Sequence, residues 1–315
     1  MRLLVTRRLT EDVRAALADR FDATFRDDPA PLTCDEARAA LADYDAILPT
    51  LGDDFRAAAF AGPVRARILA NFGVGVNHID LAAARAAGVA VTNTPGAVTD
   101  ATADLALTLM LMSARRAGEG ERLVRAGRWT GWQPTQLLGM HLTGKTLGIV
   151  GMGRIGKAIA RRAHLGLGMT IVFFNRSPVT DAGVPARQMP TLDSVMAAAD
   201  MVVIAVPGGA ETRHLIGAPQ IAAMAPHAHL INVARGDVVD EAALIAALQA
   251  RRIGGAGLDV YEREPAVPEA LRALDNVTLL PHLGTNAHEV RAAMGRMALD
   301  NLIAQAEGRA LPNPV

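Results

Sequence analysis

Three residues whose side chains could together reduce a carbonyl group stand at the ends of predicted strands late in the chain. Arg235, Glu264 and His282 each follow a short apolar run. Hydride transfer to a 2-oxo acid requires a cation that holds the carboxylate and polarises the carbonyl, a proton donor for the forming alkoxide, and a group that orients this donor. An arginine, a histidine and a glutamate match these three requirements.

Each of the three also has a structural interpretation when it is taken singly. An arginine at a strand end is usually a solvated charge, Glu264 could belong to a charge cluster with Glu262 and Arg263, and a histidine after a proline is more often structural. The carboxyl ends of parallel strands, however, form the ligand-binding edge of open α/β sheets. Three such residues on successive strand ends therefore favour an active site.

A glycine-rich turn, Gly151-Met152-Gly153-Arg154-Ile155-Gly156, follows the apolar run 147–150 and opens a helix. In this context Gly151 permits a tight turn, Gly153 lets the backbone approach a pyrophosphate, and Gly156 lets helix and strand pack closely. The helix N-terminus would then direct free N–H groups at the phosphates. The alternative is a glycine-rich turn without a ligand, but the flanking strand and helix favour dinucleotide binding.

The tip of the next strand should contact the ribose of such a dinucleotide. An acidic residue normally stands there and binds the 2′-hydroxyl, but this chain has Asn175, Arg176 and Ser177. An arginine without a carboxylate beside it suits a 2′-phosphate. We therefore expect a preference for NADP over NAD, with a solvated arginine and NAD use as the alternative.

The elements that position these residues alternate between short apolar runs and Ala-rich helical patterns, which predicts parallel sheets covered on both faces. The alternation breaks at a long helical segment, residues 99–125, and we place a domain boundary near residue 100. The last predicted helix, 287–307, could close either domain. The predicted strands are residues 3–5, 46–48, 68–70, 89–91, 147–150, 171–174, 202–206, 230–233, 256–260 and 277–280.

Composition and charge limit the partners. The formal net charge is zero and no basic run is present, so we expect no nucleic-acid or anionic-membrane partner. The longest apolar candidate, Leu105–Ala114, is about half a membrane span, and we expect a cytoplasmic protein. Cys34 is the only cysteine and cannot form an internal disulfide; it starts a helix that Thr33 and Glu36 should cap. No residue set predicts a metal site.

Taken together, the chain resembles the D-isomer-specific 2-hydroxyacid dehydrogenases over essentially its whole length. Several motifs in the right order carry this resemblance far better than any one of them. The matching stretches are residues 73–80, 93–96, 101–104, 151–156, 232–236, 257–261, 264–265 and 281–284.

The resemblance implies specific roles. His282 would give the proton to the carbonyl oxygen, Glu264 would fix its tautomer, and Arg235 would grip the carboxylate and stabilise negative charge on the oxygen. Backbone N–H groups of Val74 and Gly75 would also bind the substrate carboxylate. The expected cofactor contacts are Thr102, Gly151, Gly153, Arg154, Ile155, Gly156, Asn175, Arg176, Ser177, Val206, Pro207, Val233, Ala234, Arg235, Asp259, His282 and Gly284.

The family fold consists of two doubly wound parallel-sheet α/β domains. It implies a Rossmann-type dinucleotide-binding domain at residues 100–284. A flavodoxin-like substrate domain would comprise residues 1–99 and 285–315.

Within the family, the tip at residues 175–177 and the stretch 125–132 resemble glyoxylate and hydroxypyruvate reductases. In those enzymes the tryptophan loop lies at a dimer interface, so Trp132 could reach a partner's substrate, and a homodimer through residues 105–125 is expected. The alternative for Trp129 and Trp132 is a loop anchored by its large rings. Many relatives have Ser-Ala-Thr where this chain has residues 285–287, which leaves the preferred 2-oxo acid open.

Other functions fit less well. A methyltransferase would not need the three later residues, and formate dehydrogenases have Gln where Glu264 stands. Phosphoglycerate dehydrogenases share the motifs, although many carry a further C-terminal domain. A dinucleotide-sensing regulatory protein could retain all three residues, so turnover of a 2-oxo acid is the observation that separates it from an enzyme.

Overall fold

The computed structural model describes residues 1–315 and divides the chain into two compact units. The first consists of Met1–Val98 and Thr285–Val315, and the second of Thr99–Gly284. Each unit contains one sheet, and every strand pair in both sheets is parallel. The predicted α/β class with two parallel sheets is therefore confirmed.

The sheet of the first unit has five strands in the order β2-β1-β3-β4-β5. Its inner strands are buried along their length, because they are apolar on both faces. The strands are β1 Arg2–Val5, β2 Asp22–Phe25, β3 Ala46–Leu48, β4 Ile68–Ala70 and β5 Ala90–Thr92. The helices are α1 Glu11–Arg20, α2 Cys34–Asp43, the short 3-10 helix η1 Ala57–Phe60, α3 Leu81–Ala86 and α11 His288–Ala306.

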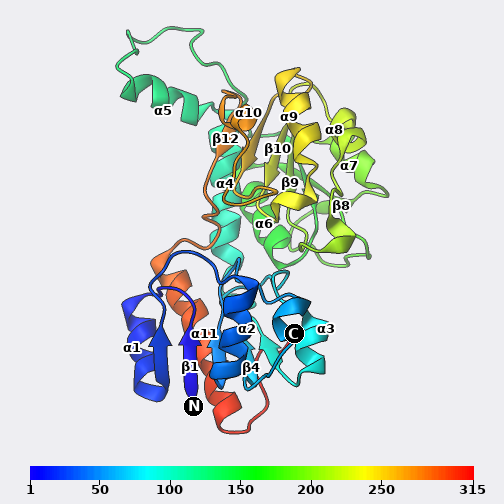
Figure 1. Cartoon of the computed structure of the whole chain (residues 1–315). Coiled ribbons are helices and arrows are strands. Elements are labelled where there is room, and N and C mark those ends of the chain that lie inside the picture. Colours follow the sequence, from blue (N-terminus) through cyan, green and yellow to red (C-terminus); the bar gives the residue numbers. More distant parts are fainter. The chain divides into compact units, whose positions relative to one another are not determined.

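The last helix, α11, packs on the first unit. A Cβ on Gly295 would lie 2.4 Å from a methyl carbon of Val13, so α1 and α11 meet closely at this glycine. The chain then returns to the sheet, where Val315 donates its N–H to the carbonyl of Val91 at 3.0 Å. The residue pattern alone left the position of this helix open, while the family resemblance implied that residues 285–315 belong with residues 1–99. The structure assigns the helix to the first unit (Figure 1).

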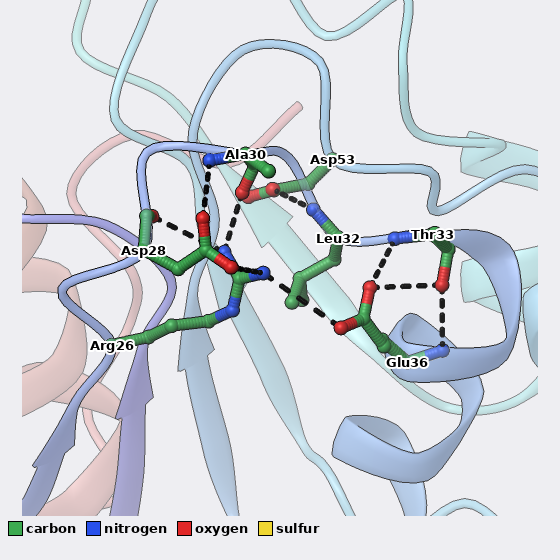
Figure 2. Close-up of polar contacts among 7 residues, drawn as sticks. All are labelled: Arg26, Asp28, Ala30, Leu32, Thr33, Glu36 and Asp53. Atoms are coloured by element: carbon green, nitrogen blue, oxygen red, sulfur yellow. Dashed lines mark hydrogen bonds and ion pairs between the residues drawn. The ribbon is translucent and has the colours of Figure 1, made fainter.

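The loop between β2 and α2 is held by a network of charged and backbone groups (Figure 2). Arg26 pairs with Asp28, and Asp53 accepts the N–H of Leu32 at 2.8 Å. Thr33 and Glu36 form the predicted capping box, since each side chain accepts the other's backbone N–H. This confirms the predicted helix start at Cys34.

The sheet of the second unit has seven strands in the order β12-β11-β10-β9-β6-β7-β8. The strands are β6 Thr146–Val150, β7 Thr170–Phe174, β8 Ala186–Gln188, β9 Met201–Ile204, β10 His229–Asn232, β11 Gly255–Leu258 and β12 Val277–Leu279. The helices are α4 Thr99–Ala114, α5 Ala117–Arg125, α6 Arg154–Leu167, α7 Leu192–Ala198, α8 Ala218–Ala223, α9 Glu241–Gln249 and α10 Glu269–Arg272, with short 3-10 helices η2 Ala210–Thr212 and η3 Gly236–Val238.

Apolar side chains cover both faces of this sheet. Along β9, Val202 contributes to one core cluster and Val203 to the other, because successive strand residues point to opposite faces. The same division holds on β10 for Leu230 and Ile231. Buried central strands of this kind hold their carboxyl ends at one fixed edge, which is where the predicted site residues lie.

The long helical segment predicted from Thr99 to Arg125 is wrong in one respect, because two helices replace it. Arg116 adopts a left-handed φ of 52° between α4 and α5, which ends the first helix. The backbone of Gly139 comes so close to Ala114 that a Cβ on this glycine would lie 2.2 Å from the Ala114 carbonyl oxygen. In Figure 1, α5 and the loop that follows it project from the rest of the second unit.

None of the helices is both long enough and apolar enough to span a membrane.

Candidate active site

The three predicted catalytic residues follow three adjacent strands of the seven-stranded sheet. Strands β10, β11 and β12 are neighbours in that sheet and run parallel. Arg235, Glu264 and His282 come after the carboxyl ends of these strands in this order. The topology therefore gathers them at one edge, as the sequence pattern predicts.

Glu264 and His282 are in direct contact. The Nδ1 atom of His282 lies 2.7 Å from Oε2 of Glu264, and the two side chains are 30% and 31% exposed. The other carboxylate oxygen of Glu264 accepts the N–H of Tyr261 at 3.0 Å. Both oxygens of the glutamate are thus used, so the carboxylate is fixed and holds the imidazole ring in one orientation.

The ionisation of Glu264 follows from its surroundings. Burial pushes its pKa upward, but the hydrogen bond with His282, together with the charge of His282, the Tyr261 N–H and Arg235, outweighs burial and holds the pKa below its ordinary value. Glu264 is therefore a carboxylate at neutral pH and accepts a hydrogen bond from Nδ1. In that arrangement Nε2 is the ring nitrogen of His282 that is not used by Glu264.

The backbone at His282 is strained and firmly held. This residue has a φ of 55°, a left-handed conformation that costs a non-glycine residue about 1–3 kcal/mol. Its N–H donates to the carbonyl of Asp259 at 2.8 Å. The buried carboxylate of Asp259 accepts the N–H groups of Leu283 at 2.6 Å and Gly284 at 2.9 Å.

Asp259 thus shapes the turn that carries His282. Burial raises the pKa of Asp259, although the amides of Leu283 and Gly284 act in the opposite direction. Thr102 adds a hydrogen bond from its hydroxyl to the carbonyl of Gly284 at 3.2 Å. The sequence suggested cofactor contacts for these residues, and the structure gives Asp259 and Thr102 a positioning role in the same unit.

Arg235 lies in a tightly packed part of the same edge. A Cβ on Gly236 would lie 1.8 Å from the Tyr261 carbonyl carbon, and one on Gly208 would lie 2.6 Å from Cγ of Arg235. Burial lowers the pKa of Arg235, while the negative charges of Glu264 and Asp237 oppose this. A guanidinium in such surroundings remains a cation and interacts more strongly with an anion than it would in water.

The glycine-rich turn after β6 is closely packed at its first and third glycines and open at its second. Gly151 has a φ of 99°, and a Cβ on it would lie 2.8 Å from the Ala205 carbonyl oxygen; one on Gly156 would lie 2.1 Å from the Gly151 carbonyl oxygen. A Cβ on Gly153, by contrast, would meet no atom within 4 Å. Gly153 also precedes α6 without a side-chain cap, so the first N–H groups of Arg154 and Ile155 suit a phosphate.

The loops on either side of this turn carry further predicted contacts. Val206 and Pro207 follow β9, and the Thr212 hydroxyl donates to the Pro207 carbonyl at 2.7 Å. Val233 and Ala234 follow β10 and are nearly buried. These positions lie at the carboxyl edge of the sheet, where the glycine-rich turn also begins.

The tip of β7 lies next to a charged group that the sequence did not reveal. Arg176 pairs with Glu211, with Nη1 2.5 Å from Oε2. No acidic residue stands within the tip itself, but η2 brings this carboxylate from 35 positions further along the chain. The expectation that Arg176 has no carboxylate beside it is therefore wrong. Sequence spacing gave no signal for Glu211, since the contact depends on the order of the strands.

The predicted anion-binding turn of the first unit has a definite architecture. The Asn71 amide donates to the carbonyls of Gly73 and Gly75 at 3.0 and 3.1 Å, and the Asn93 amide donates to the carbonyl of Val74 at 2.9 Å. Side-chain amides thus bind three successive carbonyls of the turn. Such a turn leaves backbone N–H groups available to an anion.

The tryptophan loop, in contrast, contacts little of its own unit. Trp132 is 81% exposed and Trp129 is also exposed, and α5 has no buried residue. The structure therefore does not support the alternative of a loop anchored by its large rings.

A doubly wound sheet with a glycine-rich phosphate turn, and with an Arg–Glu–His set at the same edge, defines a dinucleotide-dependent dehydrogenase fold. The sequence profile of the D-isomer specific 2-hydroxyacid dehydrogenase NAD binding domain matches residues 107–284. The chain belongs to the D-isomer-specific 2-hydroxyacid dehydrogenase family.

Individual relatives cover the whole chain. It is 40% identical to the glyoxylate reductase of Thermococcus onnurineus, covering 100% of this chain and 95% of the relative. It is 37% identical to the glycerate dehydrogenase of Hyphomicrobium methylovorum, with coverage of 95% and 94%. The structure of an NADPH-dependent glyoxylate/hydroxypyruvate reductase from Sinorhizobium meliloti, in complex with NADP and malonate, is 38% identical, with a TM-score of 0.87 and coverage of 100% and 96%.

Proposed function

We propose that this protein reduces a small 2-oxo acid, glyoxylate or hydroxypyruvate, to the D-2-hydroxy acid with hydride from NADPH, and that His282 is the proton donor. The observation that carries the proposal is the contact of 2.7 Å between His282 and Glu264, near the half-buried Arg235. The names of the glyoxylate reductases and the glycerate dehydrogenase among the relatives support the choice of substrates.

Each residue of the set has one task in the proposed reaction. Arg235 binds the substrate carboxylate and stabilises the negative charge that grows on the carbonyl oxygen. The nicotinamide cofactor, when bound, supplies the hydride that joins the carbonyl carbon. Nε2 of His282 gives its proton to the oxygen, and Glu264 stabilises the charged ring before that transfer. In the reverse direction the same nitrogen takes the proton back.

The first unit would contribute a further anion-binding group. We assign carboxylate binding to the backbone N–H groups of Val74 and Gly75, because the amides of Asn71 and Asn93 already hold the carbonyls of that turn. A backbone site recognises the carboxylate that all 2-oxo acids share. It would therefore serve glyoxylate and hydroxypyruvate alike.

The cofactor is assigned to the carboxyl edge of the seven-stranded sheet. Gly151, Gly153 and Gly156, with the N–H groups of Arg154 and Ile155, would hold the pyrophosphate. Arg176, between Asn175 and Ser177, would bind the 2′-phosphate of NADPH. The remaining contacts proposed from the family are Thr102, Val206, Pro207, Val233, Ala234, Asp259 and Gly284.

The exposed tryptophan loop is assigned to a homodimer. Trp129, Trp132 and Leu138 are all large apolar side chains that are exposed in one loop, and a cluster of this kind is typical of a protein interface. Light scattering after gel filtration should give twice the chain mass of 33.0 kDa, and Trp132→Ala should shift the protein towards monomer. Leu165→Ala, which removes a leucine of α6 that is about as exposed as Leu138, should not. A monomeric wild-type protein would contradict the assignment.

The experiment that tests the function measures initial rates with glyoxylate and with hydroxypyruvate, each with NADPH and with NADH. The proposal predicts turnover of at least one acid, faster with NADPH. Turnover only with NADH would keep the reaction and remove the role of Arg176. If neither acid turns over while both dinucleotides bind, the reductase proposal is wrong and a dinucleotide-sensing protein becomes the better explanation.

A further inference from the structure

The ion pair between Arg176 and Glu211 lies beside the glycine-rich turn. Arg176 follows β7 and Glu211 lies in η2, in the loop after β9. In the sheet, β7 and β9 are the two neighbours of β6, the strand that leads into that turn. The two charged side chains thus come from the loops on either side of the phosphate turn and meet each other.

Both loops are held by internal hydrogen bonds. On the β7 side, the Gln188 amide donates to the carbonyls of Asn175 and Ser177 at 3.2 and 3.1 Å, and Asn175 accepts the N–H of Met152 at 3.2 Å. On the β9 side, the Thr212 hydroxyl donates to the carbonyl of Pro207. These hydrogen bonds fix the backbone positions from which the side chains of Arg176 and Glu211 extend, with or without a bound ligand.

The side chains themselves are free to exchange partners. Arg176 and Glu211 are 84% and 79% exposed, and an ion pair this exposed to water contributes little to stability. A ligand group that offers either partner a better contact can replace the pair at little cost. A phosphate monoester, with about −1.5 to −2 charge and three acceptor oxygens, would be such a group for Arg176. A hydroxyl group would be a donor for Glu211.

We propose that Glu211 is a specificity-determining residue for the cofactor. It accepts a hydrogen bond from the ribose 2′-hydroxyl of NADH, and it competes with the 2′-phosphate of NADPH for Arg176. The glutamate thereby weakens NADPH binding and strengthens NADH binding, so the protein uses both. This inference rests on the proposed function, which assigns the ribose to the tip of β7.

The test uses nucleotide fragments, because they separate binding from catalysis. Isothermal titration measures the Kd of adenosine 2′,5′-bisphosphate and of adenosine 5′-monophosphate for the wild-type protein, Glu211→Gln and Arg176→Gln. Removing the glutamate's charge should tighten binding of the bisphosphate by about fivefold and weaken binding of the monophosphate. Arg176→Gln should weaken the bisphosphate by about tenfold. Glu289→Gln, an exposed glutamate of the first unit, is the control and should change neither Kd.

The outcomes separate this inference from the function itself. A bisphosphate Kd that is the same in Glu211→Gln and in the wild-type protein would overturn the role of Glu211, whatever the enzyme reduces. Absence of binding by both fragments would overturn it as well, together with the cofactor assignment. If the fragments bind with the expected pattern but no 2-oxo acid turns over, the inference stands and the proposed reaction fails.

Discussion

Glu264 accepts a hydrogen bond from His282 with one carboxylate oxygen and from the Tyr261 N–H with the other. Two donors therefore face this side chain, and only a carboxylate can accept from both. The contact requires that β11 and β12 are adjacent, which the sheet order provides. The orientation of the proposed proton donor thus follows from the topology of the sheet.

Glu264→Gln should reduce kcat by about 100-fold. The amide group of glutamine would face either His282 Nδ1 or the Tyr261 N–H, so one hydrogen bond is lost while the volume is kept. The control is Glu269→Gln, an exposed glutamate of α10, which should retain wild-type rates. Comparable kcat values for the two variants would contradict the orienting role.

The rate of the wild-type enzyme should also depend on pH through Glu264. The pKa of Glu264 in the folded protein lies below its ordinary value. The side chain therefore stays ionised at mildly acidic pH, and it loses its negative charge only as the pH falls through that lowered pKa. In the wild-type enzyme, kcat/KM should therefore fall at acidic pH as Glu264 becomes protonated. In Glu264→Gln, which lacks this titrating group, the pH dependence of kcat/KM on the acidic side should differ. An identical acidic limb in both would show that another group titrates there.

Three glycine substitutions should separate cofactor binding from stability. Gly153→Ala meets no atom within 4 Å, so the melting temperature should stay within a few degrees while dinucleotide Kd rises about tenfold. Gly156→Ala should lower both the melting temperature and the dinucleotide affinity, because its Cβ would lie 2.1 Å from the Gly151 carbonyl oxygen. Gly166→Ala, in the same helix with open space around it, should leave Kd unchanged and stabilise the protein by about 0.5–1 kcal/mol. Unchanged dinucleotide affinity in Gly153→Ala would contradict the phosphate assignment.

Folding stability should fall as the pH drops below 6.5, through His229. Burial, followed by the charge of His227, lowers the pKa of His229 to about 4, and its Nδ1 lies 2.7 Å from the hydroxyl of Ser113. Between these pH values the unfolded chain binds a proton that the folded protein does not, so about 3 kcal/mol of unfolding free energy should be lost by pH 4. Urea titrations at several pH values measure this.

His229→Gln should flatten that dependence, and His141→Ala, which removes an exposed histidine of the same unit, should preserve it. Comparing the proteins with one another cancels the contribution of their carboxylates. A slope that is equally steep in His229→Gln would assign the acid sensitivity to other groups.

The sequence predicted the central strands well and missed two at the sheet edges. The ten predicted strands all correspond to strands of the structure, but β2 and β8 were not expected. Both lie at the edge of a sheet with a single neighbour. Their residues are intermediate or exposed, so they lack the continuous apolar run by which a buried strand is found.

The site residues, too, could be predicted only where they follow an apolar run in the sequence. Arg235, Glu264 and His282 could be found because each follows an apolar strand. Glu211 could not, because its contact with Arg176 depends on β6 lying between β7 and β9. The break between α4 and α5 was also hidden, since it occurs at the left-handed backbone of Arg116, whose side chain donates to the Leu138 carbonyl, 22 positions further along the chain. Contacts across long stretches of sequence leave no periodic signal.

Proton transfer by His282 is tested most directly by comparing kcat of His282→Ala with that of His141→Ala at saturating NADPH and glyoxylate. We predict a fall of about 10²–10⁴-fold in the first variant and none in the second, with the dinucleotide Kd of both within about twofold of the wild-type protein. A His282→Ala enzyme that retained kcat within a few-fold of wild type, with its cofactor bound, would show that His282 is not the proton donor.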